Sequence, residues 1–175
     1  QAGADEYANL GLGQIPDVVT NHQFEEIAAA GKIIRPSDGK EAKSVVFVQS
    51  PGNGDDADFD YAGAVTSLVA LKQAKYVRED YEDGKAFVFY QHMRTPGSQE
   101  LYYKAAQMTD GIFMTKAAVT KVEENGGKLR VAAEDTLLGE DLSLDVDMVV
   151  LAAGMVPTTR EKATVNLAYR QGPGF

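Results

Sequence analysis

Glycine and aspartate residues gather in one loop of this chain, between a β-branched run at residues 45–48 and a helical pattern that begins near residue 62. A strand, a glycine-rich loop and a helix, in that order, form the phosphate-binding start of dinucleotide-binding domains. Gly52 and Gly54 are therefore candidate nucleotide contacts. However, residues 55–60 contain four aspartates, and carboxylates repel a phosphate.

The dinucleotide fingerprint G-x-G-x-x-G is incomplete in this loop. Ala57 stands where the third glycine is required. The strand and the helix are also separated by residues 50–61, whereas a bound pyrophosphate needs a tight turn that points helix N–H groups at it. We therefore expect no nucleotide phosphate inside this loop.

The aspartate spacing also suggests a calcium site. Asp56, Asp58 and Asp60 match the first three ligands of an EF-hand loop. Tyr61 occupies the position of the required turn glycine, and Ser67 occupies that of the bidentate glutamate. An exposed acidic loop is the better interpretation.

A second group of polar residues, His92 and Arg94, follows the apolar run at residues 85–91. Ligands of α/β sheets bind at the carboxyl ends of such strands, so Arg94 is a candidate partner for the 2′-phosphate of a pyridine nucleotide. The alternative is a loop arginine paired with a local carboxylate. The chain has two histidines, too few for a histidine-rich metal site, and no serine lies in a nucleophile elbow.

Composition restricts the classes of function. The chain has 175 residues, enough for one domain with a core, and its formal charge of −9 argues against nucleic-acid or anionic-membrane partners. Without cysteine it can form neither a disulfide nor a thiolate ligand. Because we find no signal peptide and no membrane-spanning apolar run, we expect a cytoplasmic protein without direct membrane insertion. The first residue is Gln1, and we expect a piece of a longer protein.

Hydrophobic periodicity predicts an α/β domain. Residues 1–22 read as irregular, Asn21 is the expected cap of a short helix, and Ser98 that of a later one. The order is two β-α units, a meander around the Asn-Gly-Gly turn and a last buried strand, which predicts a parallel sheet with an antiparallel three-stranded flap. The expected strands are residues 44–49, 85–91, 111–115, the two arms of a hairpin at 117–135, 141–146 and 147–154, with helices at 22–30, 62–79 and 98–108.

The last strand, DMVVLAAGMVP at residues 147–157, resembles the segment that closes the pyridine-nucleotide domain of two-dinucleotide-domain flavoprotein reductases. Together with VVTNHQFEEI, GKIIRPSDGK and FYQHMRTPG, it resembles the heterodisulfide reductase A-subunit (HdrA) family. Within that family the greatest likeness is to the B subunit of the quinone-interacting membrane-bound oxidoreductases. The resemblance covers nearly the whole chain and implies a degenerate Rossmann-like fold of the pyridine-nucleotide-disulfide-reductase type.

The resemblance also implies cofactors. The family carries FAD and iron–sulfur clusters, and Gly154 is the residue expected nearest the flavin of the longer protein. Typical members hold a [4Fe–4S] cluster with the pattern C-x11-C-x3-C-C. The four positions fall, without a gap, on Ser50, Ala62, Thr66 and Ser67. None is a cysteine, so we expect no metal cluster and no cofactor in this chain itself.

The resemblance further implies three segments: residues 1–43 as a connecting segment with a short helix, 44–157 as the Rossmann-like domain, and 158–175 as a connector toward an FAD-domain segment. The implied function is an interior domain of a flavoprotein subunit, inactive by itself, in an electron-transfer complex of sulfur-compound energy metabolism. Its partners are the other subunits of that complex. Two alternatives stay open: a pyridine-nucleotide-binding domain and a purely structural interaction module.

Overall fold

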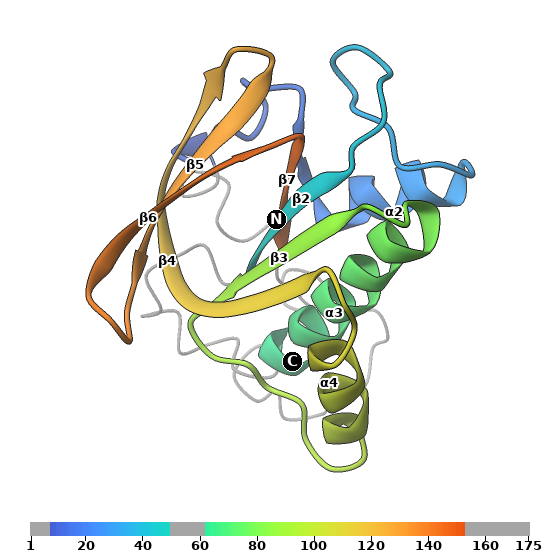
Figure 1. Cartoon of the computed structure of the whole chain (residues 1–175), viewed down its shortest axis with the longest axis vertical. Coiled ribbons are helices and arrows are strands. Elements are labelled where there is room, and N and C mark those ends of the chain that lie inside the picture. Colours follow the sequence, from blue (N-terminus) through green and yellow to red (C-terminus); the bar gives the residue numbers. More distant parts are fainter. Residues whose placement is uncertain (1–7, 50–61, 153–175) are drawn as a thin grey trace, which may run out of the picture.

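The computed structural model describes residues 8–49 and 62–152 of the chain. They form a seven-stranded sheet in the order β1-β7-β2-β3-β4-β5-β6, flanked by helices (Figure 1). The elements are β1 (Val18–Thr20), α2 (Asn21–Ala29), β2 (Ser44–Gln49), α3 (Ala62–Asp80), β3 (Lys85–Tyr90), α4 (Gln99–Gln107), β4 (Ile112–Asn125), β5 (Lys128–Asp135), β6 (Glu140–Val146) and β7 (Met148–Ala152).

Five neighbouring strands, from β1 to β4 in the sheet order, are paired in parallel. Their central members are apolar on consecutive residues because both faces of the sheet are covered. Phe47 of β2 is in register with Val88 of β3 and Val150 of β7. The predicted α/β class, with a Rossmann-like parallel sheet and an antiparallel meander, is confirmed.

The two faces of the parallel sheet pack against different layers. Val45 and Phe47 point to the face that α2 and α3 cover, where Phe47 meets Phe24 of α2 edge-to-face at 5.3 Å between ring centroids. Val46 and Val48 point to the opposite face, where they pack with apolar residues of the meander. Each central strand therefore buries both sets of side chains, and the sheet is the middle of three layers (Figure 1).

Strand β4 joins the parallel and antiparallel parts of the sheet. We expected a short strand followed by a separate hairpin arm, but β4 is one strand of 14 residues. Its first half pairs with β3 in parallel and its second half with β5 in antiparallel, with a register shift between Val119 and Lys121. The strand curves strongly (Figure 1), which turns the meander back over the second face of the sheet.

The ends of two helices differ from the prediction. Thr20, not Asn21, caps α2, because Thr20 and Gln23 form a reciprocal capping box. The segment expected to be irregular includes β1, which pairs with β7. Ser98 precedes α4 in a helical conformation and makes no capping hydrogen bond within the described residues. Helix α3 runs to Asp80, which confirms the predicted long helix.

Candidate functional site

The carboxyl ends of β2, β3 and β7 lie at one edge of the sheet, which we call the carboxyl edge. This is the edge at which open α/β sheets bind ligands. Four of the predicted site residues, Ser50, Gly52, Gly54 and Gly154, lie outside the described residues, as does the acidic loop at 55–60. The described part of the candidate site comprises the first turns of α3 and the segment that follows β3.

Ser67 links these two parts. Its side chain is fully buried, and its hydroxyl donates a hydrogen bond of 2.7 Å to the carbonyl oxygen of Gly63. The hydroxyl oxygen of Ser67 also accepts a 3.0 Å hydrogen bond from the backbone N–H of Arg94. Thr66 is also buried, and its hydroxyl lies 3.2 Å from the Gly63 carbonyl. At two of the four predicted cluster positions, Thr66 and Ser67, the side chain is therefore buried and hydrogen-bonded to the backbone.

Arg94 lies against the first turn of α3. A Cβ atom added to Gly63 would stand 3.1 Å from Cδ of Arg94, so the absence of a side chain at Gly63 permits this close approach. Arg94 is nevertheless exposed overall, as is His92. The fold therefore brings Ser67, Thr66 and Arg94 together at the carboxyl edge and leaves the arginine accessible from solvent.

Gln49, the last residue of β2, was not among the predicted site residues. Only 3% of it is exposed, and its Oε1 atom has no hydrogen-bond partner among the described residues. Alternation along β2 places its side chain on the helix-covered face, with Val45 and Phe47. A buried acceptor without a partner costs about 1–3 kcal/mol, so this oxygen is available to a donor that the described residues do not supply. The available sequence signal was a glutamine that directly follows the apolar run Val45–Val48.

Tyr90 ends β3 at the same edge. Burial raises the pKa of its phenol, and the neighbouring Tyr103, which is hydrogen-bonded to it, raises it further. The hydroxyl of Tyr90 therefore stays protonated through the neutral range and can act as a hydrogen-bond donor.

The oxygen atoms that the described residues gather at this edge belong to hydroxyl, amide and carbonyl groups. Such hard ligands suit an iron–sulfide cluster poorly, because iron–sulfur clusters are held by thiolates. Among residues 8–49 and 62–152, no three histidine, cysteine, aspartate or glutamate side chains come together as a metal site. Within the same residues, no helix is long and apolar enough to cross a membrane.

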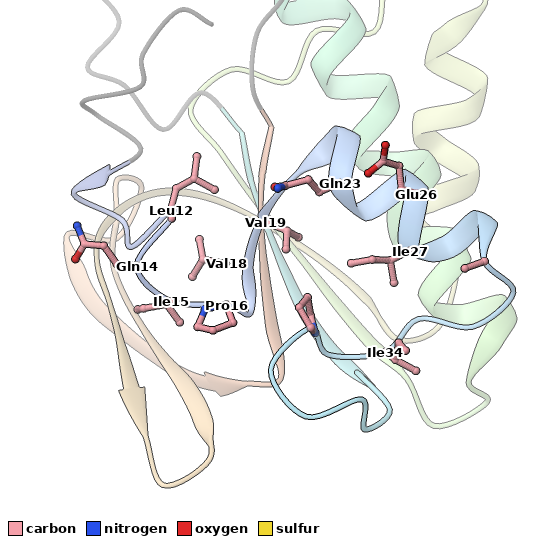
Figure 2. Close-up of a pocket in the computed structure, with 13 residues that line it drawn as sticks. Leu12, Gln14, Ile15, Pro16, Val18, Val19, Gln23, Glu26, Ile27 and Ile34 are labelled. Carbon is pink, nitrogen blue, oxygen red and sulfur yellow. The ribbon is translucent and has the colours of Figure 1, made fainter.

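A separate hollow of about 580 Å³ lies beside β1 and α2 (Figure 2). We call it the β1 hollow. Its apolar lining includes Leu12, Ile15, Val18, Ile27 and Ile34. The sequence did not predict it, because its walls come from the segment expected to be irregular, from one helix and from the loop after that helix.

Comparison with known proteins finds relatives of this chain among heterodisulfide reductase A-subunits, although no family model matches the chain. The chain is 34% identical over 169 residues to the iron-sulfur A-subunit 2 of the CoB–CoM heterodisulfide reductase of Methanopyrus kandleri, and the match covers 91% of this chain and 26% of the relative. It is 32% identical over 181 residues to the A-subunit of the H2:CoB-CoM heterodisulfide, ferredoxin reductase of Methanothermobacter thermautotrophicus, covering 97% and 27%. The chain therefore spans about a quarter of the length of these relatives.

Solved structures with a similar arrangement include two thioredoxin reductases. The enzyme of T. acidophilum is 17% identical, with a TM-score of 0.49, and the match covers 90% of this chain and 40% of that protein. The enzyme of Streptococcus pyogenes is 18% identical, with a TM-score of 0.45, over 67% of this chain and 33% of that protein.

Proposed function

We propose that this chain, which belongs to the heterodisulfide reductase A-subunit family, forms one Rossmann-like domain of a larger flavoprotein subunit in an electron-transfer complex. One observation carries the proposal: identity of 34% and 32% extends over 91% and 97% of this chain. The matches take up 26% and 27% of the relatives, so about three quarters of the length of those subunits lies outside the matched region.

In this proposal the chain acts as a scaffold beside a flavin domain. Residues 44–157 make up most of its Rossmann-like unit, to which β1 and α2 of segment 1–43 also contribute; the rest of 1–43, with 158–175, connects this unit to the rest of the subunit. FAD is bound by the longer protein, and Gly154 is the residue of this chain nearest to it.

The domain does not hold the family's [4Fe–4S] cluster. Ala62 offers no donor atom, and Ser67 already uses its hydroxyl oxygen for Gly63 and Arg94. A cysteine thiolate at position 67 would bind iron and would not make these two backbone hydrogen bonds. The hydrogen bonds of Ser67 support the view that this part of the site now serves packing.

The partners are the other subunits of a complex related to those of the named relatives, which are subunits of CoB–CoM heterodisulfide reductases. We place the complex in sulfur-compound energy metabolism, in the cytoplasm, and we assign it to the quinone-interacting type. This assignment rests on the sequence motifs, among them GKIIRPSDGK and FYQHMRTPG.

The test is to purify the longer subunit from its full reading frame and to quantify released flavin by chromatography. We expect about one FAD per subunit, since the flavin would be that protein's own cofactor. A reading frame without a flavin-binding segment, or a subunit without flavin, contradicts the proposal.

A second candidate function is pyridine-nucleotide binding at the carboxyl edge. The Oε1 of Gln49, unpartnered among the described residues, and the accessible Arg94 favour it, since one could accept a hydrogen bond and the other could pair with a phosphate. Calorimetric titration with NADPH and NADH tests it. If it holds, Arg94→Ala weakens NADPH binding by about tenfold or more and leaves NADH binding unchanged, since the loss is that of a charged phosphate contact. His92→Ala is the matched control and should leave the binding of both nucleotides unchanged. If neither NADPH nor NADH binds the native chain, this function is excluded.

A further inference from the structure

The β1 hollow is an apolar recess that the functional site does not use. Leu12, Ile15 and Pro16 form one wall, and Ile27 of α2 with Ile34 forms the other (Figure 2). Ile34 is 41% exposed although it is a large aliphatic residue. Gln14, Gln23 and Glu26 supply the polar part of the lining. An apolar floor with a polar rim is the arrangement of a surface that a partner covers.

The outer edge of β1 is closed to strand addition. The N–H of Val18 donates to the carbonyl oxygen of Ile15 at 3.1 Å, and the N–H of Thr20 donates to Oε1 of Gln23 at 2.8 Å. An added strand would need these donors. The occupant of the hollow must therefore contribute side chains, not backbone.

Both ends of the described domain lie on this flank of the sheet. The chain enters through residues 8–17, part of which lines the hollow, and Gln14 contacts the carbonyl oxygen of Ala8. It leaves at the end of β7, the neighbour of β1, where Leu151 is in register with Thr20. The chain therefore both enters and leaves the described domain on the flank of the sheet where the hollow lies.

We propose, on the premise of the function proposed above, that the β1 hollow receives an apolar segment from the part of the subunit that this chain does not span. The relatives carry about three quarters of their length outside the matched region, which supplies such a segment. Its anchor is an aliphatic or aromatic side chain that fits between Ile27 and Ile34. A lysine or arginine beside the anchor faces Glu26, which lies on the rim with 70% of its side chain exposed.

Hydroxyl-radical footprinting tests the proposal by comparing the 175-residue chain with the longer subunit. We expect oxidation of Ile27 and Ile34 to fall by about fivefold or more in the longer subunit, because a covered side chain is shielded from solvent. Leu138 is the internal control, since it is 73% exposed in the β5–β6 turn and far from β1 in the sheet order. Equal oxidation of Ile34 in the two proteins overturns the proposal.

A pair of variants separates docking from folding. Ile34→Asp replaces a residue that is already partly exposed, so the 175-residue chain should melt within about 1 °C of the native chain. In the longer subunit the same change should restore oxidation of Ile27 by about threefold or more, because a buried carboxylate opposes docking. Leu138→Asp should change neither measurement.

The outcomes also separate this inference from the proposed function. If the longer subunit contains flavin but Ile34 is not protected in it, the proposed flavoprotein function stands and the docking proposal is contradicted. Protection of Ile34 in a longer subunit that contains no flavin supports the docking site and contradicts the proposed function. Protection of Ile34 in the 175-residue chain that grows with its concentration shows that a second copy is the occupant, and this also overturns the proposal.

Discussion

The two edges of the parallel sheet are built differently. At the amino edge, where β2, β3 and β7 begin, polar groups are paired in a dense network. Ser44 and Asp147 exchange hydrogen bonds from N–H to oxygen in both directions, at 2.8 Å each. At the carboxyl edge, Gln49 ends β2 with a buried oxygen that has no partner among the described residues.

The amino edge is also sterically tight. Nη1 of Arg78 donates to the carbonyl oxygens of Glu82 and Gly84 at 2.6 and 2.7 Å, which fixes the turn between α3 and β3. Gly111, just before β4, lies against this turn with a φ of +80°. The amino edge thus holds the strands in register, whereas at the carboxyl edge the described residues leave one buried oxygen, Oε1 of Gln49, without a hydrogen-bond partner.

The largest effect that the comparison predicts is that of Gly111→Ala. An added Cβ would lie 2.8 Å from the carbonyl oxygen of Gly84, a backbone atom that cannot easily move, in a left-handed conformation. We expect a loss of about 3 kcal/mol in the free energy of unfolding, measured by urea denaturation. Gly126→Ala is the control, because Gly126 also has a positive φ but has no described atom within 4 Å of its added Cβ. It should lose about 1 kcal/mol, and equal losses would mean that the close approach contributes nothing.

The next effect is that of Asp147→Ala at the amino edge. The carboxylate accepts hydrogen bonds from the N–H and the hydroxyl of Ser44 at 2.8 and 2.7 Å, and both donors lose their partner in the variant. We expect a loss of about 2 kcal/mol in the same denaturation measurement. Asp141→Ala, at an exposed position in β6, should change stability by less than about 0.5 kcal/mol.

The contribution of Asp147 should depend on pH. Burial alone raises the pKa of its carboxyl group, but the hydrogen bonds from Ser44 and the nearby Lys128 outweigh burial and lower the pKa below its usual value. A depressed pKa in the folded state stabilises the protein above the unfolded pKa of about 3.9, and this stability is lost as the pH falls through the folded pKa. The difference in stability between the native chain and Asp147→Ala should therefore shrink in acid. A difference that grows as the pH falls would contradict this assignment.

A smaller effect is expected at the carboxyl edge from Ser67→Ala. The variant loses the hydrogen bonds of the hydroxyl to the Gly63 carbonyl and from the Arg94 N–H. We expect a loss of about 1–2 kcal/mol, together with faster amide hydrogen exchange at Arg94. Ser98→Ala is the control, since Ser98 makes no capping hydrogen bond within the described residues. Unchanged exchange at Arg94 would show that Ser67 does not hold this segment.

The smallest effect should come from Gln49→Met. Methionine retains the volume of glutamine and removes the buried oxygen that has no described partner. We expect stability to stay within about 1 kcal/mol of the native value or to rise. Gln73→Met is the control: Oε1 of Gln73 likewise has no described partner, but its amide nitrogen donates to the carbonyl oxygen of Asn21 and to Glu25 at 2.8 and 2.9 Å. It should lose about 1–2 kcal/mol, and a similar loss at Gln49 would mean that its amide is fully paired.

Much of the fold follows from local sequence patterns. The continuous apolar run of β2 predicted a strand buried on both faces, and the long helix α3 and the Asn-Gly-Gly turn before β5 were equally clear. What could not be predicted depends on tertiary contacts. Strand β1 is three residues long and exists because β7 pairs with it, and β4 appears as one strand because β3 and β5 bind its two halves.

The candidate site was predicted in part. Residue types placed Arg94 at the carboxyl edge, and the family pattern pointed to Thr66 and Ser67. The hydrogen bond between Arg94 and Ser67 joins residues 27 positions apart, and no local pattern encodes it. The β1 hollow was missed for the same reason, because its lining comes from three segments that meet only in the folded chain.

The central claim is that this chain is a family domain without the family's cluster, and anaerobic reconstitution with iron and sulfide tests it most directly. We expect the native chain to bind less than about 0.1 iron per chain and to remain colourless, because its four positions carry no thiolate. The control is the quadruple variant Ser50→Cys, Ala62→Cys, Thr66→Cys and Ser67→Cys, which should bind about four iron atoms and turn brown, since a [4Fe–4S] cluster takes four cysteine ligands. Stoichiometric iron in the native chain, with the brown colour of a cluster, would contradict the account.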